Sequence, residues 1–317
     1  MKSKQMKHAL FIISLTCLLS HLTACDNMHG ETKRALSDAA QAVVQQVEQE
    51  VAAEVENALS DVLGPEENIS KDESSTPAKA SEKQKGNIRK AEMPGKMHGV
   101  PERIIEHTGY TLSFNREHNN PNWVAWELTA EESEGTLART NEFLPDPDVP
   151  APHRVTTADY RGSGYDRGHM VPAADMKWSQ RAMSECFYMS NMCPQDHSLN
   201  SGPWSTLEKA CRRWAKNEGA VYVVCGPVYK STKPKTIGSA LRISVPDGFF
   251  KVVLSLQKGK EKAIGFYYAN RDGKQPMHET ATTVDAIEQL TGIDFFVNIP
   301  DRLEQRIEAE CALKKWQ

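Results

Sequence analysis

Asp166-Arg167-Gly168-His169-Met170 is the densest polar cluster of the chain, and a flexible Gly162-Ser163-Gly164-Tyr165 approach precedes it. A lone histidine usually has a structural role, so the segments that follow decide how this one is interpreted. Next comes Ser190-Asn191-Met192-Cys193-Pro194-Gln195, and then Leu199-Asn200-Ser201-Gly202-Pro203-Trp204-Ser205-Thr206-Leu207-Glu208. Several motifs in a fixed order are far more specific than a single motif. These three motifs together predict one candidate site.

The third motif runs into an expected helix over residues 203–216, along which Asn200, Trp204, Glu208 and Arg212 follow in steps of four. Each step turns only about 40° past a full circle, so the four side chains form one slanted stripe. An amide, a carboxylate and a guanidinium on one stripe suit a hard cation beside a phosphate. Mg²⁺ keeps several waters and therefore needs few protein oxygens. The alternative is an N-capping Asn200 followed by a surface Glu208–Arg212 pair.

These motifs resemble the DNA/RNA non-specific endonuclease family, a ββα-metal group that includes secreted bacterial sugar-non-specific nucleases and mitochondrial endonuclease G. The matching patterns are Asp-Arg-Gly-His, Ser-Asn-x-x-Pro-Gln and Leu-Asn-x-x-x-Trp-x-x-Leu-Glu. Upstream, Arg139 precedes Phe143-x-Pro145-Asp146-Pro147. Downstream, Gly226-Pro227-Val228-Tyr229 and Phe249-Phe250-Lys251-Val252 resemble later strands of the family. The resemblance covers most of residues 100–300.

The resemblance implies a role for each matching residue. His169 matches the general base that takes a proton from the attacking water, which a neutral imidazole can do near neutral pH. Asn200 matches the single protein ligand of a hydrated Mg²⁺, and Glu208 matches the carboxylate that orients the waters of the metal. Mn²⁺ or another divalent cation is an alternative to Mg²⁺.

Further matches concern the phosphate and the scaffold. Arg139 and Arg212 match the two arginines that bind the scissile phosphate and stabilise its extra charge. Asn191 matches an asparagine that positions groups near the base. Supporting roles fall to Asp166, Arg167 and Gly168, the glycine allowing a close turn of the backbone. The implied reaction is hydrolysis of internal phosphodiester bonds of DNA and/or RNA, leaving 5′-phosphates, with little sequence specificity because arginines contact the backbone.

Residues 98–317 have the composition of a folded domain, since aromatic residues and Val/Ile runs are frequent there and all six tryptophans lie within it. Short strands without regular βα alternation predict an α+β fold, and the resemblance implies a ββα-metal fold with a central antiparallel sheet flanked by helices. The expected strands are residues 124–128, 187–189, 221–224, 249–256 and 263–268, with a turn at 258–260. A second helix is expected over 283–291, where Val284, Ile287 and Leu290 share a face.

Residues 1–24 have the pattern of a signal peptide: Lys2, Lys4 and Lys7, a short apolar core and a small-residue end. The apolar core is too short to span a bilayer, which takes about 20 residues. Leu22-Thr23-Ala24-Cys25 resembles a bacterial lipobox. We therefore predict acylation of Cys25 and export to the bacterial cell envelope, where the lipid anchors the chain in a membrane. An ordinary signal peptide with a chance cysteine is the alternative.

Two segments, residues 25–64 and 65–97, separate this anchor from the domain. In the first, apolar residues at steps of three and four from Leu36 to Val62 predict an amphipathic helix, which Gly64-Pro65 ends. Small residues dominate the stripe, which favours a solvated spacer; a coiled-coil stalk that joins copies into a homo-oligomer is the alternative. The second segment, rich in Ser, Lys, Glu, Pro and Gly, predicts a disordered linker.

The charge balance excludes one class of nucleic-acid protein. With 38 basic and 42 acidic side chains the net charge is −4, so the chain cannot coat nucleic acid by bulk charge, and a nuclease must rely on local arginines and a cation. Two rival hypotheses are a catalytically silent nucleic-acid-binding lipoprotein and a structural envelope protein organised by the helical spacer. Mg²⁺-dependent cleavage distinguishes the nuclease from both. An inhibitor protein that protects the host stays open as a partner.

Overall fold

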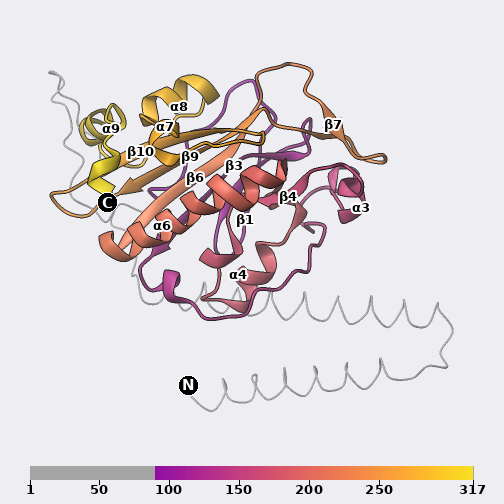
Figure 1. Cartoon of the computed structure of the whole chain (residues 1–317), viewed down its shortest axis with the longest axis horizontal. Helices are drawn as coiled ribbons and strands as arrows, with labels where there is room; N and C mark the ends of the chain where they lie inside the picture. The colour runs from indigo at the N-terminus through magenta and orange to yellow at the C-terminus, as the bar shows by residue number, and fades with distance from the viewer. Residues whose placement is uncertain (1–89, 317) are drawn as a thin grey trace, which may run out of the picture. The chain divides into compact units, whose positions relative to one another are not determined.

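The computed structural model describes residues 90–316, and its centre is one antiparallel sheet (Figure 1). Within this described part, seven strands are hydrogen-bonded side by side, and every pairing between neighbours is antiparallel. In spatial order they are β1 (Arg103–Glu106), β2 (Thr111–Asn115), β3 (Asn120–Thr129), β6 (Ala220–Val228), β9 (Gly248–Ser255), β10 (Lys262–Ala269) and β11 (Ala281–Thr282). The predicted α+β class with a central antiparallel sheet is confirmed.

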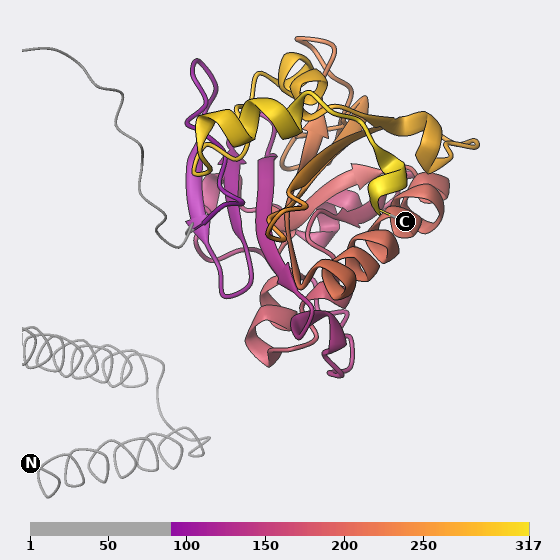
Figure 2. The ribbon, with the colours of Figure 1, turned by 90° about the vertical axis from the view of Figure 1, so that its left-hand side faces the viewer.

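Helices bury both faces of this sheet (Figures 1 and 2). On one face lies α6 (Ser205–Glu218), and on the other lie α8 (Val284–Thr291) and α9 (Asp301–Glu308). The strand period of two sorts the side chains: Val223 packs in the core under α6, and Val224 packs in the core under α8. The central strands are therefore apolar on both faces, and each such side chain contributes about 1.5–3 kcal/mol when fully buried.

Shorter elements complete the described part. Outside the main sheet, β4 (Asp166–His169) pairs with β5 (Met192–Gln195), and β7 (Thr236–Ile237) pairs with β8 (Ile243–Ser244). The shorter helices are α3 (Thr157–Tyr160), α4 (Gln180–Glu185), α5 (His197–Leu199) and α7 (Met277–Thr280), and the 3₁₀ or π turns are η1 (Glu132–Glu134), η2 (Ala151–His153), η3 (Ala173–Asp175), η4 (Met189–Asn191), η5 (Asn200–Trp204) and η6 (Leu313–Trp316). Of these, β4 carries the Asp-Arg-Gly-His motif.

Most predicted elements are confirmed, and one is wrong. The strands expected at 124–128, 221–224, 249–256 and 263–268 correspond to β3, β6, β9 and β10, and the helices expected at 203–216 and 283–291 correspond to α6 and α8. The expected strand at 187–189 does not form in the described chain; Tyr188 makes a single bridge to Leu144, and η4 follows. Phe187 is fully buried because its ring packs against those of Phe143 and His169, at centroid distances of 5.1 and 4.9 Å. Its burial comes from aromatic contacts and not from strand pairing.

The folded domain begins before residue 98, where the sequence predicted the end of a disordered linker. Ala91 is fully buried in the core under α8. The amide of Gly95 donates to the carbonyl of Asp294 (2.8 Å), and the side-chain amide of Asn298 donates to the carbonyl of Lys90 (2.8 Å). Residues 90–97 therefore belong to the domain, because the buried Ala91 and these two hydrogen bonds attach them to it.

The predictions for the N-terminal segments lie outside the described residues. They are the signal peptide (1–24), the acylation of Cys25, the helical spacer (25–64) and the linker up to residue 89. Between residues 90 and 316, none of the helices has both the length and the apolar character that crossing a membrane requires.

Candidate active site

His169 is placed by the two-stranded ladder of β4 and β5. In this ladder it pairs with Met192, and the next residue, Met170, is fully buried in the core under α6. Gly168 is needed because Gln195 packs against it: a Cβ at position 168 would lie 2.2 Å from the side-chain oxygen Oε1 of Gln195. The glycine is thus required by close packing and not by a tight turn.

The imidazole of His169 lies among aromatic rings and guanidinium groups. Its centroid is 4.9 Å from that of Phe187 and 5.6 Å from that of Phe143. Arg139 lies 5.0 Å from the Phe187 centroid, and Arg167 lies 4.1 Å from the Phe143 centroid. Burial and then the charges of the two arginines lower the pKa of His169 to about 3. The imidazole is therefore neutral at physiological pH, and its buried Nε2 has no hydrogen-bond partner among the described residues.

Asn200 opens the π turn η5 directly before α6. Gly202 has a non-helical backbone and Pro203 lacks an amide hydrogen, so the regular helical hydrogen bonds are interrupted here. The side-chain nitrogen of Asn200 donates to Oδ2 of Asp166 (2.9 Å), and Nδ1 of His197 lies 2.9 Å from the same oxygen. A carboxylate can only accept, so Asn200 turns its nitrogen to Asp166 and leaves its carbonyl oxygen for a cation.

This geometry excludes the capping role considered for Asn200. The cap of α5 is Asp196, whose Oδ1 accepts from the amides of Ser198 and Leu199. In the described chain α6 then begins without a side-chain cap. Asn200 bonds instead to Asp166 of β4, which gives Asp166 a more direct part in the site than the support of the backbone that the sequence predicted.

Glu208 and Arg212 lie one turn apart on α6, and Trp204 ends η5 one turn before Glu208, as the stripe predicted. Trp204 is fully buried, and its indole N–H donates to the carbonyl of His169 (3.4 Å), which ties the start of α6 to β4. The alternative was a surface pair between Glu208 and Arg212, but Arg212 bonds to another carboxylate. Its Nη1 donates to Oδ1 of the buried Asp175 (2.7 Å), which holds the guanidinium in a fixed place.

Behind Glu208 lies a buried lysine to which the sequence assigned no role in the site. Lys251 is fully buried, with Nζ 4.5 Å from the ring centroid of Trp204 and 4.9 Å from that of Trp126. Burial alone would lower the pKa of Lys251, but neighbouring thiols and carboxylates, Glu208 among them, outweigh burial and raise it. Burial raises the pKa of Glu208 to about 7, although Lys251 opposes the rise. The available signal was a single charge inside the otherwise uncharged run 249–256.

Asn191 is fully buried, and both the nitrogen and the oxygen of its side-chain amide form hydrogen bonds with the backbone. The nitrogen donates to the carbonyls of Val171 (3.0 Å) and Cys186 (2.8 Å), and the oxygen accepts from the amide of Val171 (3.0 Å). Asn191 therefore fixes the chain just after His169. It is a positioning residue and not a group that faces substrate.

A further polar group lies in the neighbouring loop. His107, Asp146 and Asp148 have ligand atoms within 4.8 Å of one another and could hold a metal ion by residue type. Nε2 of His107 lies 3.1 Å from Oδ2 of Asp146, and Ser190 donates to the same oxygen. Burial alone would raise the pKa of Asp146, but these hydrogen bonds outweigh it and lower the pKa. Because Ser190 precedes Asn191, the group ties the loop of Asp146 to the turn that positions the chain after His169.

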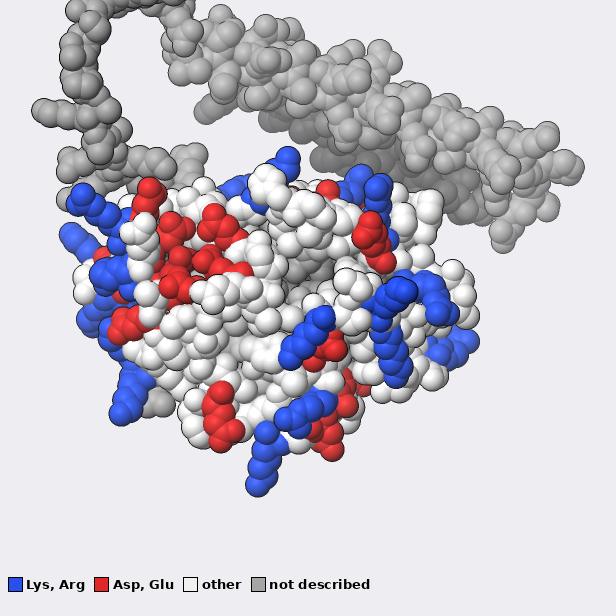
Figure 3. Space-filling model, turned by 90° about the horizontal axis from the view of Figure 1, so that it is seen from above, with Lys and Arg blue, Asp and Glu red and all other residues white. Residues whose placement is uncertain are grey.

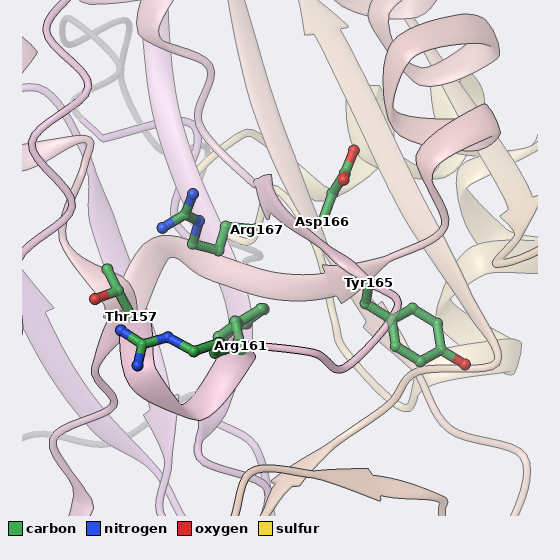
Figure 4. Close-up of a pocket in the computed structure, with 6 residues that line it drawn as sticks. Thr157, Arg161, Tyr165, Asp166 and Arg167 are labelled. Carbon is green, nitrogen blue, oxygen red and sulfur yellow. The ribbon is translucent and has the colours of Figure 1, made fainter.

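A polar cavity of about 360 Å³ opens beside β4 (Figure 4). Its lining residues are Thr157, Tyr160, Arg161, Tyr165, Asp166 and Arg167. Figure 4 shows the guanidinium groups of Arg161 and Arg167 toward one side, near Thr157, whereas the Asp166 carboxylate points to the other side. Two guanidinium groups in a hollow beside β4 suit an anion such as a phosphate.

Known proteins resemble this chain over the described domain. A model of the DNA/RNA non-specific endonuclease family matches residues 90–302. Nuclease 1, mitochondrial, of Schizosaccharomyces pombe is 35% identical over 68% of this chain and 72% of its own. Endonuclease G, mitochondrial, of Homo sapiens is 34% identical over 68% of this chain and 74% of its own. A chain in the crystal structure of an EndoG/EndoGI complex has a TM-score of 0.61 and 31% identity, covering 68% of this chain and 92% of that one.

Proposed function

The chain belongs to the DNA/RNA non-specific endonuclease family and is a hydrolase of phosphodiester bonds in nucleic acid, and on that premise we propose that it is a Mg²⁺-dependent endonuclease of DNA and/or RNA. The observation that carries the proposal is the neutral, buried His169, whose Nε2 is uncommitted within the described domain. Beside it, one ladder carries both the base and Asp166, which holds Asn200. The products are fragments with 5′-phosphates.

His169 takes a proton from the attacking water. The Nε2 lone pair accepts the proton as the water oxygen bonds to phosphorus, and the bond from phosphorus to the 3′ oxygen breaks. A pKa near 3 makes the free imidazole a weak base. Burial depresses this pKa most and the charges of Arg139 and Arg167 add to this, so a bound phosphate that neutralises the two arginines would remove only their part of the depression.

Asn200 and Glu208 have the donor chemistry for a hydrated Mg²⁺. The bond to Asp166 leaves the carbonyl oxygen of Asn200, and Glu208 adds a partly buried carboxylate on the same stripe. These hard oxygen donors leave most positions to water, which is how Mg²⁺ is usually held. When bound, the cation neutralises charge on the phosphate and on the leaving oxygen. Mn²⁺ or another divalent cation fits the same oxygens.

Arg139 and Arg212 bind the scissile phosphate in this proposal. Arg212 is held from behind by Asp175, and the exposed Arg139 is oriented by Asn141, whose Oδ1 accepts from its Nε (3.1 Å). Guanidinium groups pair with phosphate oxygens along two parallel hydrogen bonds. Such contacts read the backbone and not the bases, so the expected cleavage has little sequence specificity.

Plasmid digestion tests the proposal. We expect the purified chain to cleave supercoiled DNA in Mg²⁺, EDTA to stop cleavage, and His169→Ala to lower the rate by about 100-fold or more with an unchanged Tm. His278→Ala, at an exposed histidine of α7, is the matched control and should keep the parental rate. Equal rates for His169→Ala and the parent would remove His169 as the base. Binding of DNA without Mg²⁺-dependent cleavage would support the catalytically silent lipoprotein instead.

We also propose that the chain is exported and anchored in a bacterial envelope through an acylated Cys25. The support is the sequence of residues 1–25 with its basic start, short apolar core and lipobox-like end. Labelling with radioactive palmitate in a bacterial host should mark the parent and not Cys25→Ser. Equal labelling of the two would contradict the anchor.

An inhibitor protein is a further proposed partner. Its support is the similar chain solved in an EndoG/EndoGI complex, which is described as a mechanism of EndoG inhibition. Soluble extract of the producing cells should slow plasmid digestion by the purified chain, and heat treatment of the extract should remove the effect. An extract that leaves the rate unchanged contradicts this proposal.

A further inference from the structure

Three acidic side chains meet on the face of the sheet opposite to α6. Asp285 and Glu288 lie one turn apart on α8, and Glu308 is the last residue of α9. One carboxylate oxygen from each lies within 4.8 Å of the other two. Figure 3 looks down on α8 and α9 and shows acidic side chains gathered there, on the left of the view. The cluster joins two helices whose inner faces pack in one core through Ile287 and Ile307.

Glu308 gives this cluster a property that a solvated acidic patch lacks. The residue is only 5% exposed, and its Oε1 is buried without a hydrogen-bond partner in the described part of the chain. Burial and the neighbouring carboxylates of Glu288, Glu304, Asp285 and Asp294 raise the pKa of Glu308 to about 9. At neutral pH Glu308 therefore keeps its proton unless a cation displaces it, and a cation that did so would pair with the buried carboxylate.

Neighbouring groups hold the cluster in place without neutralising it. Oε1 of Glu288 accepts from the amide of Phe295 (2.8 Å), so this carboxylate has a fixed position and a second oxygen for a ligand. Two basic side chains of the same C-terminal segment pair with other acids: Arg306 lies 3.7 Å from Glu261, and Lys315 donates to Glu310. Neither of these ion pairs neutralises Asp285, Glu288 or Glu308, and a cation from solution would supply positive charge there.

We propose that Asp285, Glu288 and Glu308 bind a Ca²⁺ ion that clamps α8 to α9. Carboxylate oxygens are the hard donors that Ca²⁺ prefers, and Ca–O distances of about 2.3–2.6 Å place opposite ligands about 4.6–5.2 Å apart. The three carboxylate oxygens lie close enough together to share one such ion. Mg²⁺ is usually held by one or two carboxylates and several waters, so a site with three carboxylates favours Ca²⁺. The clamp stabilises the outer layer and takes no part in the nuclease reaction, because Asn200 and Glu208 lie on the side of α6.

Thermal unfolding of the full chain, stripped with EDTA and titrated with Ca²⁺, tests the clamp. The parental Tm should rise by about 5 °C once Ca²⁺ exceeds its Kd about 100-fold. Glu308→Gln should lose this rise, because Gln keeps the volume but not the charge, and should digest plasmid in Mg²⁺ at the parental rate. Glu279→Gln removes an exposed charge of α7 and should keep the rise. Asn200→Ala should keep it too, which separates this site from the active-site metal.

Calorimetric titration with Ca²⁺ gives the direct measurement, with one ion bound by the parent and none by Glu308→Gln at the clamp. A Tm that Ca²⁺ leaves unchanged overturns the proposal, and so does an equal rise in the parent and Glu308→Gln. Stabilisation by Mg²⁺ at the same concentrations overturns the assignment to Ca²⁺. Should Glu308→Gln fail to fold, Asp285→Asn takes its place with the same expected loss. A Ca²⁺ response without nuclease activity would leave the clamp standing and overturn only the proposed function.

Discussion

Replacing Asp166 by alanine should weaken Mg²⁺ binding although it removes no metal ligand. Oδ2 of Asp166 accepts from the side-chain nitrogen of Asn200 at 2.9 Å and lies 2.9 Å from Nδ1 of His197. The carboxylate thereby decides which end of the Asn200 amide faces the proposed position of the metal. Without it, the amide can turn either end toward the cation, and the oxygen is presented only part of the time.

The size of the effect follows from the hydrogen bond and its exposure. A hydrogen bond to a charged group contributes about 1.5–3 kcal/mol, and the lower end applies because the Asp166 side chain is 33% exposed. About 1.5 kcal/mol corresponds to about a tenfold change in affinity. We therefore expect the Mg²⁺ concentration at half-maximal rate to rise about tenfold, and the rate at saturating Mg²⁺ to fall by less than about threefold. Asp166→Asn keeps an acceptor but not the charge and should raise that concentration about threefold.

Initial rates of plasmid nicking against Mg²⁺ concentration measure both quantities. His197→Ala is the matched control, because the His197 side chain is 77% exposed and its loss should leave the Mg²⁺ dependence nearly unchanged. The reasoning is refuted if Asp166→Ala has the parental half-saturating Mg²⁺ concentration together with an unchanged Tm. If His197→Ala weakens Mg²⁺ binding as much as Asp166→Ala, the histidine and not the carboxylate orients Asn200.

Three further predictions concern stability. Gly168→Ala should cost about 1–3 kcal/mol, because its Cβ would lie 2.2 Å from Oε1 of the buried Gln195; an unchanged urea midpoint would contradict the packing argument. In EDTA, the free energy of unfolding of the parent should fall by up to about 3 kcal/mol as pH rises from about 4.5 to 7, because the folded pKa of Glu208 is about 7 against an ordinary value of 4.5 and the folded state binds the extra proton. Glu208→Gln should flatten this slope, and an equal slope in both proteins would assign it to other groups. Lys251→Met should lower the free energy of unfolding by about 3 kcal/mol at pH 8, because it leaves carboxylates uncompensated, and by less at pH 5, where Glu208 is protonated; equal losses in urea unfolding at the two pH values would argue against the coupling.

Local periodicity in the sequence predicted the arrangement of several site residues. Steps of four residues place Glu208 and Arg212 on one side of a helix whatever the rest of the fold does, and the structure confirms that arrangement on α6, with Trp204 at the end of η5 directly before it. Continuous apolar runs likewise predicted β6, β9 and β10, because strands buried on both faces form such runs. The run at 187–189 shows the limit of this reasoning: a short apolar segment is equally compatible with aromatic packing, which is what buries Phe187.

Motif order and helical spacing are local properties of the chain, so the family, the α+β class and the candidate site residues His169, Asn200 and Glu208 could be predicted from the sequence. The partners of these residues could not, because folding brings them together from distant positions. Asp166 meets Asn200 across 34 positions, and Asp175 meets Arg212 across 37.

The same holds for charge. The depressed pKa of His169, the raised pKa of Glu208 and the acidic cluster between α8 and α9 arise from burial and from neighbours distant in the chain. The type of a residue fixes which charge its side chain can have. Its pKa and its partner depend on the surroundings that folding brings together, and no local pattern records them.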